Sequence, residues 1–260
     1  MDYFDIVDFW QRQKIKSSNE LSAVLTAYAV NFAYNSGKIE NDKITYHDTR
    51  EIFDKDGVTS YTGDLKTLFE IQNSKKAYEF ILEAYDNNKE INEEFIKKVQ
   101  KLLTIGTYDK RRYELGERPG EYKHRDYVVG RTESGALFED VPEEMQELLD
   151  ELKDVSDVDT LTVAAYFHAK FENIHPFSDG NGRTGRLIMN YFLISNNHPP
   201  IIIYEEDRKE YYEALEEFDA NSKLKPLIDF LQKELIKTWE KSVDKVYKNP
   251  TLKELLENTD

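Results

Sequence analysis

The sequence predicts a mainly α-helical protein. Apolar residues recur at helical spacing over most of the 260 residues, and only two short segments break that rhythm. Hydrophobic residues make up 39% of the chain, and the 17 Tyr and 14 Phe supply bulky side chains for a core. A chain of this length builds one large domain, or a core with a smaller appendage.

Each expected helix combines an apolar stripe with a start or stop signal. The stripes follow the spacing i, i+3, i+4 and i+7, which is one face of an amphipathic helix. In chain order, one helix begins at Ser17, Ser18 or Asn19 and carries Leu21, Val24, Leu25 and Tyr28, and another runs from Asn92 to Gly106 with Phe95, Val99, Leu102 and Leu103. Then follow residues 142–155 with Met145, Leu148, Leu149 and Leu152, a helix capped by Asp207 with Tyr211, Leu215 and Phe218, and a long helix from Pro226 through Trp239 to Val246.

Two segments break the helical rhythm. Residues 127–138 have the pattern of two short strands joined by a loop in which Gly135 supplies a positive φ, so we expect a β-hairpin there. Residues 201–204 are β-branched but short and follow two prolines, which favours an extended link between helices. After Pro250 the chain is polar, and we expect a loosely attached tail.

Composition argues against several classes of function. Lys and Arg number 35 against 51 Asp and Glu, a net charge of −16, which argues against a surface that binds nucleic acid by neutralising its phosphates. The lack of Cys in the sequence excludes disulfides, thiolate metal sites and a cysteine nucleophile. The first residues do not follow a signal-peptide pattern and no stretch approaches 18 apolar residues, so we expect a cytoplasmic protein without a membrane partner.

Residues 174–187 concentrate the side chains that can carry chemistry. They read Ile-His-Pro-Phe-Ser-Asp-Gly-Asn-Gly-Arg-Thr-Gly-Arg-Leu and form a polar connection that opens the second of two helices. A helix start offers unpaired N–H groups and partial positive charge, and glycines let an anion approach closely. Arg183 and Arg186 lie three apart on the first turn, and each can donate a forked hydrogen bond to a phosphate. The segment therefore predicts a phosphate site beside a titratable base, His175.

Three other motifs fit this segment less well. Residues 180–185 match G-x-G-x-x-G, but Pro176 and polar residues precede them where a dinucleotide fold needs a buried strand. A P-loop needs Lys followed by a hydroxyl residue, where this chain has Arg186 followed by a leucine. An EF-hand starting at Asp179 would place Arg183 among the calcium ligands.

The string H-P-F-S-D-G-N-G-R-T-G-R, residues 175–186, resembles the signature of the Fic family, whose members mostly transfer the AMP of ATP onto a hydroxyl side chain of a target protein. The resemblance implies a Fic-type helical bundle in which the 127–138 hairpin forms a flap beside the active-site loop. It implies a catalytic core over residues 90–235, an N-terminal helical region over 1–89, and a helix end and polar tail over 236–260. Gln100 and Lys123 stand where many members carry His and Arg.

The resemblance implies a role for each residue of the signature. His175 would be the general base that accepts the proton of an incoming Tyr, Ser or Thr hydroxyl. Asp179 would hold Mg²⁺ or Mn²⁺. The triphosphate would be bound by Gly180, Asn181 and Gly182 at the α- and β-phosphates, Arg183 at the leaving pyrophosphate and Arg186 at the γ-phosphate.

A second motif predicts control of this site. Residues 36–41, Ser-Gly-Lys-Ile-Glu-Asn, fit the inhibitory pattern of the self-inhibited Fic branch and directly follow an expected N-terminal helix. We expect Glu40 to pair with Arg186 in the resting protein and to displace the γ-phosphate, with Ser36 and Asn41 completing the motif. Some self-inhibited relatives also remove AMP, so a role of Glu40 in de-AMPylation stays open.

The remaining expectations concern partners. We expect ATP and a target protein that presents a hydroxyl residue to the 127–138 hairpin by strand-like pairing, and the chain itself is one candidate target. Dimerisation is common in similar proteins, so the resemblance also implies a homodimer. Tyr204, Tyr212 and Leu215 are candidates for contact with adenine. Two alternatives to AMP transfer stay open: removal of AMP from a modified protein, and a binding module that senses nucleotide without transfer.

Overall fold

The computed structural model describes residues 1–59, 61–127, 135–153 and 159–248. Within these ranges the elements are helical and no strand occurs, so the prediction of a mainly α-helical protein is confirmed. None of the described helices is both long and apolar enough to cross a membrane. In chain order the elements are α1 (Tyr3–Arg12), α2 (Ser18–Glu40), α3 (Tyr46–Lys55), α4 (Leu65–Asp86), α5 (Glu93–Thr104), α6 (Lys110–Glu114), α7 (Val141–Glu151), α8 (Thr160–Ile174), α9 (Asn181–Ser195), the 3-10 turn η1 (Glu205–Asp207), α10 (Arg208–Asn221) and α11 (Lys225–Lys248).

The helix starts depend on capping side chains, as the sequence indicated. Ser17 caps α2 by accepting a hydrogen bond from the Glu20 N–H, and Asn92 caps α5 by accepting one from the Phe95 N–H. The prediction for Asp207 is wrong in its chemistry. Asp207 precedes α10, but its carboxylate makes no capping bond and pairs with Lys237 of α11 instead.

The two segments outside the helical pattern have different outcomes. Residues 201–204 form a buried or half-buried irregular link, as expected. Residues 128–134 lie outside the described residues, as do residues 249–260 of the expected tail, so the 127–138 hairpin stays a prediction. Gly135 has φ +65°, as predicted, and the Ala136 N–H donates to the Ile174 carbonyl at 3.0 Å. The end of the predicted flap therefore lies against the chain just before His175.

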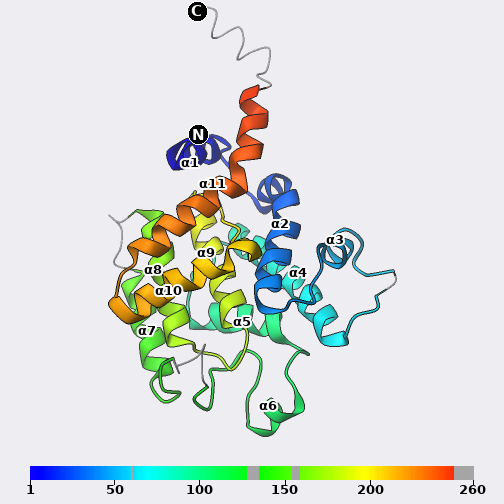
Figure 1. Ribbon diagram of the computed structural model, residues 1–260, viewed down its shortest axis with the longest axis vertical. Helices are drawn as coiled ribbons and strands as arrows, with labels where there is room; N and C mark the ends of the chain where they lie inside the picture. Colours follow the sequence, from blue (N-terminus) through cyan, green and yellow to red (C-terminus); the bar gives the residue numbers. More distant parts are fainter. Residues whose placement is uncertain (60, 128–134, 154–158, 249–260) are drawn as a thin grey trace, which may run out of the picture.

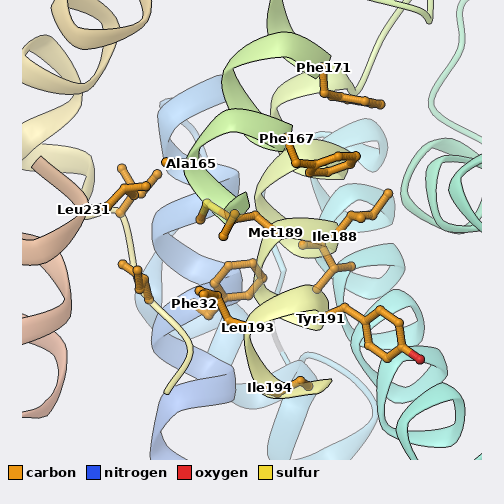
Figure 2. Close-up of a cluster of buried hydrophobic side chains, with 14 of the residues drawn as sticks. Phe32, Ala165, Phe167, Phe171, Ile188, Met189, Tyr191, Leu193, Ile194 and Leu231 are labelled. Atoms are coloured by element: carbon orange, nitrogen blue, oxygen red, sulfur yellow. The ribbon is translucent and has the colours of Figure 1, made fainter. Parts of the chain in front are cut away.

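The core is built around the packing of α8 against α9. In Figure 1, α9 lies at the centre, with α8 and α10 on one side and α2 and α4 on the other. Buried residues of α1, α2 and α4 join the same hydrophobic cluster as those of the predicted 90–235 core, so both parts hold the site in place. Figure 2 shows side chains that fill this cluster: Phe167 and Phe171 from α8, Ile188 and Met189 from α9, and Leu231 from α11.

We expect Phe167→Ala to lower the free energy of unfolding by about 3–5 kcal/mol, because it leaves a cavity in a fully buried position between α8 and its neighbours. Urea denaturation followed by far-UV circular dichroism measures this loss. Phe4→Ala on α1 is the matched control, since Phe4 is 74% exposed. A loss for Phe167→Ala no larger than that for Phe4→Ala would contradict the packing described.

Candidate active site

The loop between α8 and α9 is held in a fixed shape by its own residues. His175 ends α8 with φ +50°, and Gly180 precedes α9 with φ +82°. The Asn181 amide donates to the Phe177 carbonyl at 2.8 Å, and its oxygen accepts from the Phe177 N–H at 2.9 Å. Phe177 is fully buried and packs against Phe171, so it anchors the loop in the core as expected. Asn181 thus uses its side chain to close the turn.

Gln100 connects this loop to the rest of the core. It is fully buried on α5, and its amide donates to the Asp179 carbonyl at 2.9 Å and to the Tyr108 hydroxyl at 3.0 Å. Its oxygen accepts from the Gly120 N–H. Gln100, which sequence reasoning left without a role, therefore ties the loop to the segment around Gly120.

The start of α9 has the properties of an anion site. No side chain among the described residues caps this helix, so its first N–H groups face the loop without a capping partner. Arg183 and Arg186 are 5% and 1% exposed. Arg183 Nε and Nη1 and Arg186 Nη1 are buried and make no hydrogen bond to the described residues. Buried guanidinium donors in this state fit a ligand rich in acceptors.

The structure brings the predicted inhibitory motif to Arg186. Arg186 Nη2 lies 2.8 Å from Glu40 Oε1, and the same guanidinium donates to the Ser36 hydroxyl at 3.0 Å and to the Ser36 carbonyl at 2.9 Å. The expected pairing of Glu40 with Arg186 is therefore present. One detail was wrong: the motif does not follow the helix but forms its last turn, with Glu40 as the final residue of α2 and Asn41 as its C-cap.

Gly182 shows where the Glu40 carboxylate lies relative to α9. A Cβ on Gly182 would overlap the Glu40 carboxylate and would lie 2.8 Å from Arg186 Nη1. The carboxylate thus sits directly against the backbone of the second residue of α9. The carboxylate is thus the anionic group that lies at this helix start, where partial positive charge favours an anion.

Asp179 carries the carboxylate expected to hold a metal ion. Its Oδ1 accepts from Arg183 Nη2 at 3.2 Å, and its Oδ2 lies 3.7 Å from Arg112 Nη2 of α6. Within the described ranges no three metal-binding side chains come together. A single, partly exposed carboxylate beside side chains that can bind phosphate fits Mg²⁺, which takes most of its ligands from phosphates and water.

His175 carries an uncharged imidazole at neutral pH. Burial and the nearby Lys123 ammonium lower the pKa of His175 to about 4, so its imidazole is neutral at pH 7. Its Nδ1 is buried and has no hydrogen-bond partner among the described residues. Lys123 is 2% exposed, and its backbone N–H donates to the Pro176 carbonyl at 2.9 Å. Lys123, the other departure from the family pattern, therefore lies close enough to His175 to lower its pKa.

A second carboxyl, Glu172, lies near Arg186 and was missed by sequence reasoning. Burial raises the pKa of Glu172 to about 8, although the charge of Arg186 opposes this shift. The carboxyl is therefore mostly protonated at pH 7. In that form it does not compete with Glu40 for the charge of Arg186.

The expected adenine contacts lie in different places. Tyr212 is 42% exposed on α10, and burial together with the charge of Glu40 raises its pKa to about 12, so it borders the site. Leu215 is buried one turn further along the same helix. Tyr204 instead places its ring 4.3 Å from Lys237 Nζ of α11. Contact with adenine stays a prediction for all three.

Comparison with known proteins shows which family the chain resembles. A family model described as the Fic/DOC family matches residues 90–193. The chain is 30% identical over 204 residues to a Nematostella vectensis protein named Protein adenylyltransferase Fic, covering 76% of this chain and 45% of that protein. It is 37% identical over 95 residues to the Caenorhabditis elegans Protein adenylyltransferase fic-1, covering 36% of this chain and 18% of that protein. The matched part of the chain thus spans less than half the length of these relatives.

A solved structure extends the likeness to nearly the whole chain. A Fic-domain-containing signaling protein from Bacteroides thetaiotaomicron is similar with a TM-score of 0.81 and 26% identity, covering 96% of this chain and 98% of that one. The N-terminal helices are therefore part of the shared fold. The expected Fic-type helical bundle is confirmed.

We expect Glu172→Gln to change how stability depends on pH. The pKa of Glu172 in the folded protein, about 8, lies above the unfolded value of about 4.3, so the folded state holds a proton that the unfolded state releases. The stability from this group is present below about pH 4.3 and is lost as the pH rises to about 8. The free energy of unfolding of the parent, relative to Glu172→Gln, should therefore fall over this range.

Urea denaturation at several pH values across that range measures the difference. Glu147→Gln, at an exposed position of α7, is the matched control and should give a smaller trend. A difference between parent and Glu172→Gln that stays constant with pH would contradict the raised pKa.

Proposed function

Since residues 90–193 belong to the Fic/DOC family, we propose that this chain transfers AMP from ATP onto a Tyr, Ser or Thr hydroxyl of a target protein and releases pyrophosphate. The observation that carries the proposal is the buried Arg186 at the start of α9, paired with Glu40 and retaining an unused donor. Relatives named protein adenylyltransferase support ATP as the nucleotide.

The residues at the start of α9 would bind the phosphates. Its N–H groups and the closely approachable Gly182 would receive the α- and β-phosphates, while Arg183 and Arg186 would neutralise the pyrophosphate and the γ-phosphate. Asn181 would contribute by fixing the loop that presents these groups. Asp179 would hold Mg²⁺ or Mn²⁺, which when bound neutralises phosphate charge.

His175 would act on the incoming hydroxyl. The hydroxyl oxygen forms a bond to the α-phosphorus, the bond from that phosphorus to the pyrophosphate oxygen breaks, and a ring nitrogen of neutral His175 takes the hydroxyl proton. A target segment would dock along the predicted 127–138 hairpin, whose end at Ala136 is hydrogen-bonded to the Ile174 carbonyl next to His175. The homodimer stays a prediction.

Glu40 would keep the resting enzyme inactive. Its carboxylate lies where the γ-phosphate would meet Arg186, so ATP could not engage that arginine until Glu40 leaves. Two alternatives remain: Glu40 orienting water for removal of AMP, and nucleotide sensing without transfer. The two experiments below separate them.

We expect Glu40→Gly to raise AMP transfer by about tenfold or more, because a hydrogen bond between charged groups contributes about 1.5–3 kcal/mol to the competing resting state. The measurement is intact-mass analysis of the protein and of candidate targets after incubation with ATP and Mg²⁺. Glu151→Gly is the matched control, since Glu151 is also the last residue of its helix, α7.

Three results would each contradict one part of the proposal. Unchanged or lower modification in Glu40→Gly would reject inhibition by Glu40. Tight ATP binding without any modified product would favour the sensing module. Loss of AMP from a pre-modified target in the parent, abolished by Glu40→Gly, would favour de-AMPylation as the activity of the resting enzyme.

We expect His175→Ala, introduced into the Glu40→Gly variant, to reduce AMP transfer by about 10²–10⁴-fold, the usual contribution of a general base. The affinity for ATP should change little, because His175 is placed to act on the hydroxyl and not on the phosphates. Transfer rates and ATP titration by calorimetry measure the two quantities. Transfer at the rate of the Glu40→Gly variant would show that another group takes the proton.

A further inference from the structure

Glu70 of α4 lies between the phosphate site and the end of the inhibitory helix. It is 4% exposed, and its Oε2 accepts a hydrogen bond from Asn41 Nδ2 at 2.6 Å. Its Oε1 lies 3.8 Å from Arg183 Nη1 and 3.7 Å from Lys66 Nζ. One carboxylate thus contacts a phosphate-binding arginine on one side and the last residue of the inhibitory motif on the other.

The Asn41 side chain fastens the end of α2 to α4. Besides Glu70, its amide donates to the Thr67 hydroxyl at 3.0 Å, and its oxygen accepts from the Lys43 N–H at 3.0 Å. Its backbone N–H closes the last turn of α2 on the Gly37 carbonyl at 2.9 Å. The side chain therefore uses both its donor and its acceptor at the point where α2 stops.

The position of Glu40 depends on this attachment. Glu40 is the last residue of α2, its side chain is about a third exposed, and within the described residues its carboxylate pairs with Arg186 alone. The final turn of a helix frays unless its end is held by neighbouring groups. Asn41, the next residue, fixes this end of the helix through its hydrogen bond to the buried carboxylate of Glu70.

We propose that Glu70 is a positioning residue which keeps Glu40 on Arg186 by binding Asn41. This inference rests on the proposed function, because it concerns how the inhibited state is maintained. With the bond between Asn41 and Glu70 in place, the end of α2 stays against α4 and Glu40 covers the phosphate site. Without it, the last turn of α2 opens, Glu40 leaves, and Arg186 becomes available to ATP.

Two substitutions of Glu70 separate the hydrogen bond from the charge. Glu70→Gln keeps an oxygen that can accept from Asn41, whereas Glu70→Leu has a similar size and no acceptor. Both remove the charge that faces Arg183, so that effect cancels in the comparison. We expect Glu70→Leu to raise the kcat of AMP transfer above that of Glu70→Gln by about three- to tenfold, the range for loss of one hydrogen bond.

Asn41→Ala tests the same bond from the other side and should raise kcat by a similar factor. Asn31→Ala is the matched control, because Asn31 lies on the same helix and its amide donates to the Ala27 carbonyl within that helix. In the Glu40→Gly background, Asn41→Ala and Glu70→Leu should add no further gain, since the residue they position is gone.

A readout independent of activity completes the test. Hydrogen exchange of the backbone amides of residues 36–41 should become faster in Asn41→Ala and Glu70→Leu than in the parent and in Glu70→Gln. Equal exchange and equal kcat in the two Glu70 variants would overturn the inference. So would a loss of activity in both backgrounds together with a lower Tm, which would show a merely structural role. If Glu40→Gly itself transfers no AMP, the proposed function fails, while the exchange data still decide whether Asn41 and Glu70 hold the end of α2.

Discussion

The charge of Arg186 is the constraint on which the rest of the site depends. A guanidinium that is 1% exposed cannot stay buried without a negative partner, and the start of α9 adds positive potential at the same place. The fold meets this need with Glu40, which comes from α2, 146 residues earlier in the chain. A nucleoside triphosphate would also supply the negative charge that Arg186 requires. The contact with Glu40 and the proposed substrate would therefore each satisfy the same electrostatic requirement.

Burial shifts the pKa values of the other two titratable groups near the loop in opposite directions. It lowers the pKa of His175 to about 4 and raises that of Glu172 to about 8, so both are uncharged at neutral pH. Burial of Arg186 acts to lower its pKa, but the neighbouring Glu40 carboxylate outweighs this and raises the pKa above the usual arginine value, so this guanidinium keeps its charge. The site thus combines permanent positive charge for phosphates with a neutral imidazole that can accept a proton.

The contiguous parts of the molecule could be predicted from sequence, and the parts assembled from distant segments could not. Apolar stripes located α2, α5, α7, α10 and α11, but α4 was missed because its buried face includes the polar residues Thr67, Glu70 and Asn73. The loop 175–186 and the turn 36–41 were found because each carries a motif within a dozen residues. Gln100, Glu70 and Glu172 belong to no motif, and only packing of α4, α5 and α8 around α9 brings them to the loop. The pairing of Glu40 with Arg186 was recovered because a family pattern, and not spacing, connects them.

Gly182 limits how such a protein can change over evolutionary time. A side chain at this position would meet both the Glu40 carboxylate and the Arg186 guanidinium, because both lie against the same stretch of backbone. A larger residue there would separate Glu40 from Arg186 and leave the buried guanidinium without its carboxylate. A lineage that keeps the pair of Glu40 and Arg186 must therefore keep glycine at position 182.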